Sequence, residues 1–291
     1  MKKIHLLLML TLLSMLVACA GGGGSSSSSS GTSPFTAWSA VAPNTSIQLS
    51  GSSTTVVAAG STAGYGATGN FTFDTARNLT AISMTSSTGA GASFNASSGD
   101  SFYQGIGNGT VFAVNKQGIG AVVVNPYDAA FEYQTFGAWG SYANGPQPSN
   151  ASAVSLGSAT SVTGMPSTGS ATFNGFSAGM YYQGAAGYFT AANMSAGVDF
   201  AARTIALNTT NTVVTGAVTG AASIQSPTLN MTGYGTYASG TSRFSGSLTT
   251  ANGMIGTMTG QFYGPNANEI GGTYFATGSQ GYTVGGFGGK R

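Results

Sequence analysis

Cysteine and histidine, the two residue types that most often perform covalent or metal chemistry, occur once each, as Cys19 and His5. Cys19 ends the segment Leu16-Val17-Ala18-Cys19, which follows two lysines and an apolar run too short to span a bilayer. This order is typical of the lipobox of bacterial lipoproteins, in which the Cys thiol receives a diacylglycerol unit and the chain is cut just before it. A plain secretory peptide that ends in Cys by chance is the alternative. We predict a signal peptide over residues 1–18 and acylation of Cys19, including palmitate.

Cleavage before Cys19 would remove His5 from the mature chain. The mature chain would then lack the residues of a Ser–His–Asp triad, of a Cys–His pair and of a His/Cys zinc site. A pair of carboxylates could still hydrolyse glycosides, and Glu132 lies in an aromatic stretch that could shift its pKa. A solvated or hydrogen-bonded strand residue is the simpler interpretation of Glu132. We therefore expect no enzyme, no catalytic residue, no metal and no cofactor.

The charge of the mature chain argues against polyanionic partners. Eight Lys and Arg and six Asp and Glu are present, and Lys2 and Lys3 leave with the signal peptide, so six basic residues balance six acidic ones. A neutral chain without a basic stripe is not expected to bind nucleic acid or an anionic membrane surface. The expected contact with the membrane is the lipid on Cys19.

Composition divides the remainder of the chain into three parts. Residues 19–34 contain a run of glycines and the serines Ser25–Ser30, which is typical of a flexible tether. A stretch rich in Pro, Gly and Asn at residues 144–150 separates an aromatic-rich segment from one rich in Gly, Ser and Thr. We predict an N-terminal β-rich domain over residues 35–148 and a C-terminal β domain over residues 149–291.

Hydrophobic alternation predicts an all-β fold. Over residues 254–263 one face carries Met254, Met258 and Phe262 with small glycines between them, while the other face is mixed. Glycines on an inner face make room for large side chains across a tightly curved barrel. Asn252-Gly253 predicts a tight turn just before this strand, and the segments 74–78 and 199–203 predict two more.

The segment Gly64–Gly69 spells GxGxxG, the pattern of dinucleotide-binding loops. That function requires a strand before the glycines and a helix after them, whose N-terminus faces the pyrophosphate. Here an alternating strand follows at residues 70–73, and glycine is common throughout the chain. We interpret the segment as a chance match.

Aromatic residues cluster between positions 127 and 142. Tyr and Trp are frequent in binding surfaces because they offer a large rigid contact area with a polar tip. They serve equally well in a core or between domains, which we consider the more frequent case. Tyr127, Tyr133 and Trp139 are therefore weak candidates for ligand contacts.

Residues 260–275, which read GQFYGPNANEIGGTYF, resemble the strand–turn–strand signature of β-barrels of the transferrin-binding protein B type. Segments 197–205 and 285–291 agree with this family in order and spacing, and segments 38–45 and 132–139 are similar to the domain before the barrel in short, single-lobe members. The resemblance implies a handle-like β-rich domain followed by an eight-stranded antiparallel up-and-down barrel filled by side chains. Gly264-Pro265-Asn266 would form the turn, and we expect Glu269 to accept amide protons of that turn.

The same resemblance implies a lipoprotein of the outer membrane, displayed on the cell surface, that binds a protein or a haem or iron carrier through variable loops. It also implies an outer-membrane translocator that recognises the barrel. A structural or adhesive envelope lipoprotein without an iron-related ligand is the alternative. A barrel that itself spans the membrane is a third, minor possibility, against which the lipid anchor and the charged end Lys290-Arg291 argue.

Overall fold

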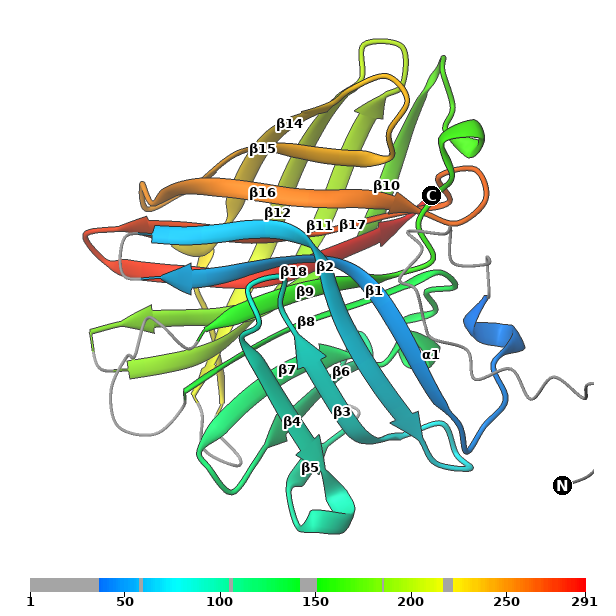
Figure 1. The fold of residues 1–291 in the computed structure, drawn as a ribbon. Helices are drawn as coiled ribbons and strands as arrows, with labels where there is room; N and C mark the ends of the chain where they lie inside the picture. The colour runs from blue at the N-terminus through cyan, green and yellow to red at the C-terminus, as the bar shows by residue number, and fades with distance from the viewer. Residues whose placement is uncertain (1–36, 58–59, 105–106, 142–150, 185, 217–221) are drawn as a thin grey trace, which may run out of the picture. The chain divides into compact units, whose positions relative to one another are not determined.

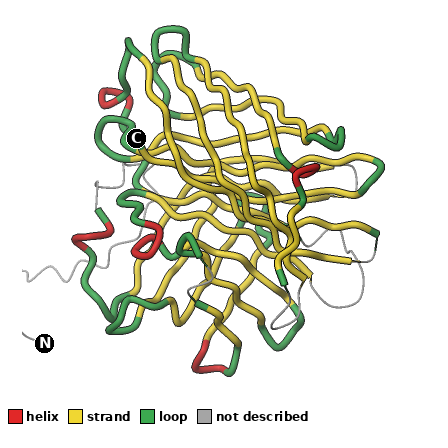
Figure 2. Tube along the Cα trace, turned by 180° about the vertical axis from the view of Figure 1, so that it is seen from behind, coloured by secondary structure: helices red, strands yellow, loops and turns green. Residues whose placement is uncertain are grey.

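The computed structural model of the chain describes residues 37–57, 60–104, 107–141, 151–184, 186–216 and 222–291, all of which fall in the structural unit at residues 32–291. The predicted signal peptide, Cys19, the tether and the stretch at residues 144–150 lie outside the described residues. In the described part of the chain, no helix is long and apolar enough to cross a membrane. Nearly all regular structure is strand, with short helices and loops at the strand ends (Figure 2).

Two antiparallel sheets make up the unit (Figure 1). The first has the order β4-β3-β2-β1-β9-β8-β7-β6-β5. Its strands are β1 (Ser46–Val57), β2 (Gly60–Phe73), β3 (Leu79–Thr85), β4 (Gly91–Asn95), β5 (Ser101–Tyr103), β6 (Thr110–Val114), β7 (Ile119–Val124), β8 (Gln134–Ser141) and β9 (Ser152–Gly157). The short helices η1 (Trp38–Ala40), η2 (Ala96–Ser98) and α1 (Pro126–Ala129) accompany it.

The second sheet closes into a barrel, because β11 pairs with both β10 and β12. Its eight strands are β10 (Ser170–Gln183), β11 (Ala186–Asp199), β12 (Thr204–Gly216), β14 (Met231–Tyr237), β15 (Arg243–Thr250), β16 (Ile255–Tyr263), β17 (Glu269–Gly278) and β18 (Gly281–Lys290). The short strand β13 (Ser223–Gln225) pairs only with β12, and η4 (Val162–Gly164) and η5 (Pro227–Leu229) are short helical turns. The predicted all-β fold with an eight-stranded up-and-down barrel is confirmed.

The alternation predicted for residues 254–263 is present in β16. Met258 and Phe262 belong to the barrel core, whereas Ile255 on the other face is exposed. Asn252-Gly253 forms the turn between β15 and β16, with Gly253 in the left-handed region at φ 85°. The segment Gly64–Gly69 lies inside β2, so no helix follows these glycines and the rejection of a dinucleotide loop is supported.

Strands β7 and β8 are buried on both faces because each face covers a different core. Val123 and Trp139 face the first core, which lies inside the first sheet. Val122 and Phe136, on the opposite faces, pack against barrel residues such as Phe176. We call this second set, which joins the first sheet to the outside of β10, β17 and β18, the junction core. The two-residue period of a strand assigns neighbouring side chains to the two cores.

The chain passes from the first sheet to the barrel between Gly157 and Ser170. Strand β9, at residues 152–157, pairs with β1 and β8 and so belongs to the first sheet. The domain boundary predicted from composition assigns residues 152–157 to the C-terminal domain. The division of the chain into two domains at residues 148 and 149 stays a prediction.

Glu269, at the start of β17, has different partners from those expected. Within the turn before it, the Asn266 N–H donates to Asn268 Oδ1 at 3.2 Å. Glu269 accepts hydrogen bonds from the backbone N–H groups of Glu132 and Tyr133, which precede β8 in the first sheet. The expectation that Glu269 accepts amide protons of its own turn is wrong, because both carboxylate oxygens are taken by N–H groups of the first sheet. The residues around position 269 do not indicate that this sheet approaches.

Candidate binding site

Tyr127, the first of the three aromatic candidates, seals one end of the first core. It is half-buried, its hydroxyl donates to the Val41 carbonyl at 3.3 Å, and its ring lies 5.1 Å from that of Phe73. The Arg77 guanidinium lies 4.6 Å above the same ring. Burial raises the pKa of Tyr127, and the charge of Arg77 opposes that shift. These contacts make Tyr127 a packing residue with one cation beside it.

Trp139 and Tyr133 lie in different places. Trp139 belongs to the first core, with 2% of its surface exposed. Tyr133 is half-buried at the junction of the two sheets, where its ring lies close to Gly264 of the barrel. The structure therefore does not bring Tyr127, Tyr133 and Trp139 together on one surface. A ligand contact at any of them stays a prediction.

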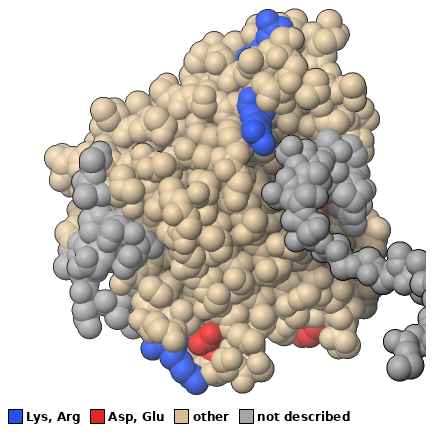
Figure 3. Space-filling view, in the orientation of Figure 1, with Lys and Arg blue, Asp and Glu red and all other residues tan. Residues whose placement is uncertain are grey.

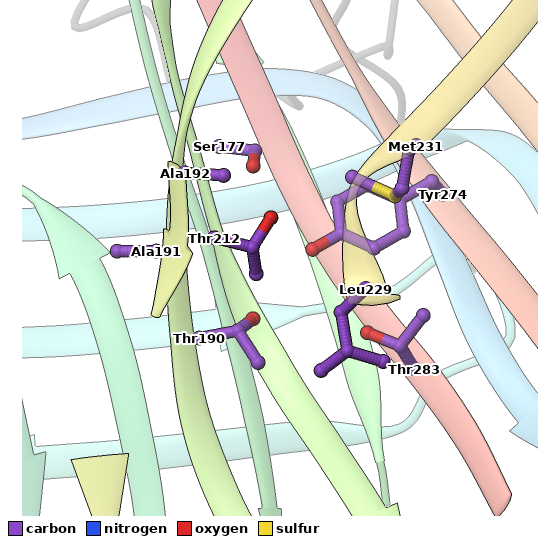
Figure 4. Close-up of a pocket in the computed structure, with 9 residues that line it drawn as sticks. All are labelled: Ser177, Thr190, Ala191, Ala192, Thr212, Leu229, Met231, Tyr274 and Thr283. Atoms are coloured by element: carbon purple, nitrogen blue, oxygen red, sulfur yellow. The ribbon is translucent and has the colours of Figure 1, made fainter. Parts of the chain in front are cut away.

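The described residues fill most of the barrel interior with side chains. A cavity of about 10 Å³ remains among polar and apolar side chains, enough for a single water molecule. Figure 4 shows the hydroxyls of Ser177, Thr190, Thr212, Tyr274 and Thr283 around it. The fold positions these side chains on the inner faces of β10, β11, β12, β17 and β18. A ligand larger than a water molecule does not fit this cavity.

A surface hollow of about 470 Å³ lies where β2 approaches the barrel strands β14, β15 and β16. Three side chains from the two sheets line it and carry its chemistry, namely those of Tyr65, Tyr237 and Arg243. Smaller residues complete it, among them Ala63, Gly64, Thr236, Ala238, Thr241, Ser245 and Thr259. We call it the Tyr65 hollow.

Tyr65 is fixed in this hollow by contacts with the barrel. Its hydroxyl donates to the carbonyl oxygens of Gly260 at 3.1 Å and of Phe244 at 3.3 Å. The Arg243 guanidinium carbon lies 4.2 Å from the centre of the Tyr65 ring. Burial raises the pKa of Tyr65 to about 12, and the positive charge of Arg243 opposes the shift. Tyr65 is therefore un-ionised at neutral pH, and its ring supports a cation.

Arg243 is exposed at the rim of the hollow. The described residues place no carboxylate against its guanidinium, which packs on the Tyr65 ring. On the face of the molecule that Figure 3 shows, charged side chains are sparse. An oriented cation beside two tyrosines is well suited to a carboxylate of a binding partner.

Sequence reasoning missed both residues of this pair. Tyr65 is the second residue of the GxGxxG segment, in which the glycines are the recognisable signal and the tyrosine is not part of the pattern. Arg243 is the exposed first residue of β15, and nothing in its sequence neighbourhood marks it as part of a site. A cation–π pair between residues 178 positions apart has no local signal in the sequence.

Residues 165–291 match the family model for the C-lobe and N-lobe beta barrels of Tf-binding protein B. A mutant of the vaccine antigen Transferrin Binding Protein B from Haemophilus parasuis is 14% identical, with a TM-score of 0.45, and the match covers 78% of this chain and 54% of that one. The isotype 1 protein from serogroup B Neisseria meningitidis is 17% identical, with a TM-score of 0.42, and the match covers 79% and 53%.

The N-lobe domain of Lactoferrin Binding Protein B of Moraxella bovis is 12% identical, with a TM-score of 0.38, over 67% of this chain and 81% of that one. The chain spans about half the length of the first two structures. No curated protein matches it.

Proposed function

We propose that this chain, whose residues 165–291 belong to the family of transferrin-binding protein B β-barrels, is a lipid-anchored binding protein of the cell surface. Its ligand is a protein or a haem or iron carrier, held on the outside of the molecule. The alternative is a structural or adhesive envelope lipoprotein with no iron-related ligand.

The Tyr65–Arg243 pair is the observation that carries this proposal. The described core of the barrel is packed with side chains around a cavity of about 10 Å³, so the proposal places the ligand on the surface. On that surface, Arg243 lies 4.2 Å above a tyrosine ring and is contributed by a different sheet from Tyr65. Tyr and Arg are the residue types that dominate binding energy at protein interfaces, since both give large contacts with directed polar groups. A protein partner that presents an acidic side chain fits this hollow.

The proposed lipid on Cys19 would determine the location of the protein. Cys19 would carry the lipid, and the Gly- and Ser-rich residues 19–34 would span roughly 20 Å on average between the membrane and the folded unit. The proposed location is the outer membrane, with the folded unit facing outward after transfer by an outer-membrane translocator. Catalysis is not part of the proposal, because the mature chain would contain no histidine and no free thiol.

Two experiments on intact cells test the location. In the first, Cys19→Ser replaces the lipidated residue, and labelling with radioactive palmitate should disappear while the chain becomes soluble. In the second, protease is added to whole cells and to lysates. Digestion of the chain on whole cells supports surface display, whereas digestion only in lysates contradicts it.

Capture by cells that display the full chain tests the binding function. Cells are incubated with serum and with purified haem and iron carriers, and the retained proteins are identified. Retention of one such protein, dependent on the displayed chain, supports the proposal. Retention of none favours the structural or adhesive alternative. A titration with free haem is a useful addition, since Tyr or Met would have to ligate the iron in a mature chain without His.

A further inference from the structure

Gly197, on the outer face of β11, lacks the packing constraint that explains other glycines of the barrel strands. A Cβ on Gly256 would overlap the carbonyl oxygen of Phe275, and one on Gly288 would lie 2.5 Å from Phe136 Cε1. A Cβ on Gly197 would meet no atom within 4 Å, and Gly197 is not among the residues with positive φ. Glycine inside a strand weakens it and often marks the close approach of another molecule. The open space above Gly197 therefore suggests that another molecule binds there.

A hollow of about 470 Å³ surrounds Gly197 on the outside of β10, β11 and β12. Gly197 pairs with Thr172 on one side and with Ala206 on the other. Gly197 and Ala206, which have little or no side chain, therefore form the floor of the hollow. Ser170, Asp199 and Thr204 line it nearer the end of the strands.

An exposed tyrosine occupies the next strand position after the lining of the hollow. Ala206 pairs in register with Tyr234 of β14, whose side chain is 57% exposed. Thr172, Gly197, Ala206 and Tyr234 therefore form one row across four neighbouring strands, and all four are exposed. Paired residues of neighbouring strands are about 5 Å apart, so a tyrosine ring can border a group that rests on Gly197 and Ala206.

The chemistry of the hollow restricts its occupant. Strands β10, β11 and β12 are paired with one another in a closed barrel, so a peptide cannot bind here by adding a strand. The side chains offer the hydroxyls of Thr172 and Thr204 and the carboxylate of Asp199. The Asp199 carboxylate is oriented by hydrogen bonds from the N–H groups of Ala201 and Ala202, both 2.9 Å long.

Asp199 is the one charged residue in the lining, and its negative charge repels phosphate, sulfate and carboxylate groups. A neutral sugar ring suits a surface that offers one carboxylate and the hydroxyls of Thr172 and Thr204. Its hydroxyls can donate to the carboxylate and exchange hydrogen bonds with the threonines, and its C–H face can pack on an aromatic ring. We propose that the hollow around Gly197 binds a pyranose ring of a neutral glycan. This site is separate from the Tyr65 hollow and does not depend on the proposed protein ligand.

Filling the hollow provides the test. Gly197→Val adds a side chain where a Cβ meets no atom, and valine favours strands, so the variant should be at least as stable as the wild type. Tyr234→Ala removes the aromatic border. Thr249→Val is the control for an exposed valine on the barrel surface, since Thr249 is an exposed residue of β15 and does not line the hollow.

The full-length proteins, in mild detergent, are applied to an array of neutral and sialylated glycans, and the retained glycans are then titrated. We expect the wild type and Thr249→Val to bind at least one neutral glycan. Gly197→Val and Tyr234→Ala should bind it at least tenfold more weakly, while Gly197→Val keeps an unchanged or higher Tm. No binding to any neutral glycan, a preference for sialylated glycans, or wild-type affinity in Gly197→Val overturns the proposal.

Discussion

The Glu269 carboxylate on the first residue of β17 accepts a hydrogen bond from the Glu132 backbone N–H at 2.6 Å, and one from the Tyr133 N–H at 3.1 Å. These bonds join the barrel to the segment that enters β8 of the first sheet. The side chain of Glu132 continues the connection, since its Oε2 accepts from the Ser39 N–H at 3.1 Å and from the Ser39 hydroxyl at 2.9 Å. One buried carboxylate thus holds the barrel against the segment that contacts η1.

The burial of Glu269 predicts that stability depends on pH. Burial raises its pKa from 4.5 to about 7, reinforced by the charge of Glu132 and opposed by the two backbone N–H groups and by Lys290. Between pH 4.5 and 7 the folded chain therefore binds more protons than the unfolded chain does. The free energy of unfolding should fall as the pH rises through this range, by on the order of 3 kcal/mol. Urea unfolding at a series of pH values measures it.

Glu269→Gln is the control for this effect, because glutamine does not titrate. The variant should lose the fall in stability between pH 4.5 and 7, although it also loses an acceptor for one N–H group. The lowered pKa of Asp74, caused mainly by hydrogen bonds from Asn78, affects stability only at lower pH. A wild-type profile that is flat or rises over this range would contradict the role assigned to Glu269.

Tyr263 and Ser155 form a second buried link between the sheets. The Tyr263 hydroxyl and Ser155 Oγ are 2.8 Å apart, and both residues are fully buried. Tyr263→Phe and Ser155→Ala each leave a buried hydroxyl without this partner, so each should lower the free energy of unfolding by about 1–3 kcal/mol. In the double variant the losses should not add, with a coupling of about 1 kcal/mol. Fully additive losses would show that the hydroxyls act independently.

Gly288 tests how closely the first sheet approaches the barrel. A Cβ at this position would lie 2.5 Å from Phe136 Cε1, and the Phe136 ring is held between those of Phe131 and Phe176. Gly288→Ala should therefore cost about 1–3 kcal/mol of stability. Gly197→Ala, in open space on the same barrel, should instead keep or raise stability, by up to about 1 kcal/mol. Equal effects of the two substitutions in urea unfolding would mean that the junction core is looser than described.

The sequence predicted those parts of the fold that depend on neighbouring residues. The period of two in β16 placed Met258 and Phe262 inside the barrel, and Asn252-Gly253 predicted the turn before it. These features are local, because a strand alternates its side chains and a tight turn needs particular dihedral angles. The resemblance in residues 260–275 supplied the number of strands, which alternation alone does not give.

The site could not be predicted in the same way, because it depends on the approach of two sheets. Tyr65 and Arg243 meet only when β2 lies beside β15, and Glu269 meets Glu132 only when β17 lies beside β8. Trp139 shows the opposite difficulty, since an aromatic residue of a binding surface and one of a core look alike in sequence. The pairing of β9 with β1 likewise joins distant segments and has no local signal in the sequence.

Binding by cells that display Arg243→Gln tests the central claim most directly. The control is Arg77→Gln, which removes the other arginine that lies over a tyrosine, here Tyr127 in the first core. The affinity for the captured serum protein or carrier is measured for both variants and the wild type on intact cells. We predict that Arg243→Gln weakens binding at least tenfold, a loss of about 1.4 kcal/mol, and that Arg77→Gln leaves it unchanged. Wild-type affinity in Arg243→Gln, or a loss confined to Arg77→Gln, would contradict the account.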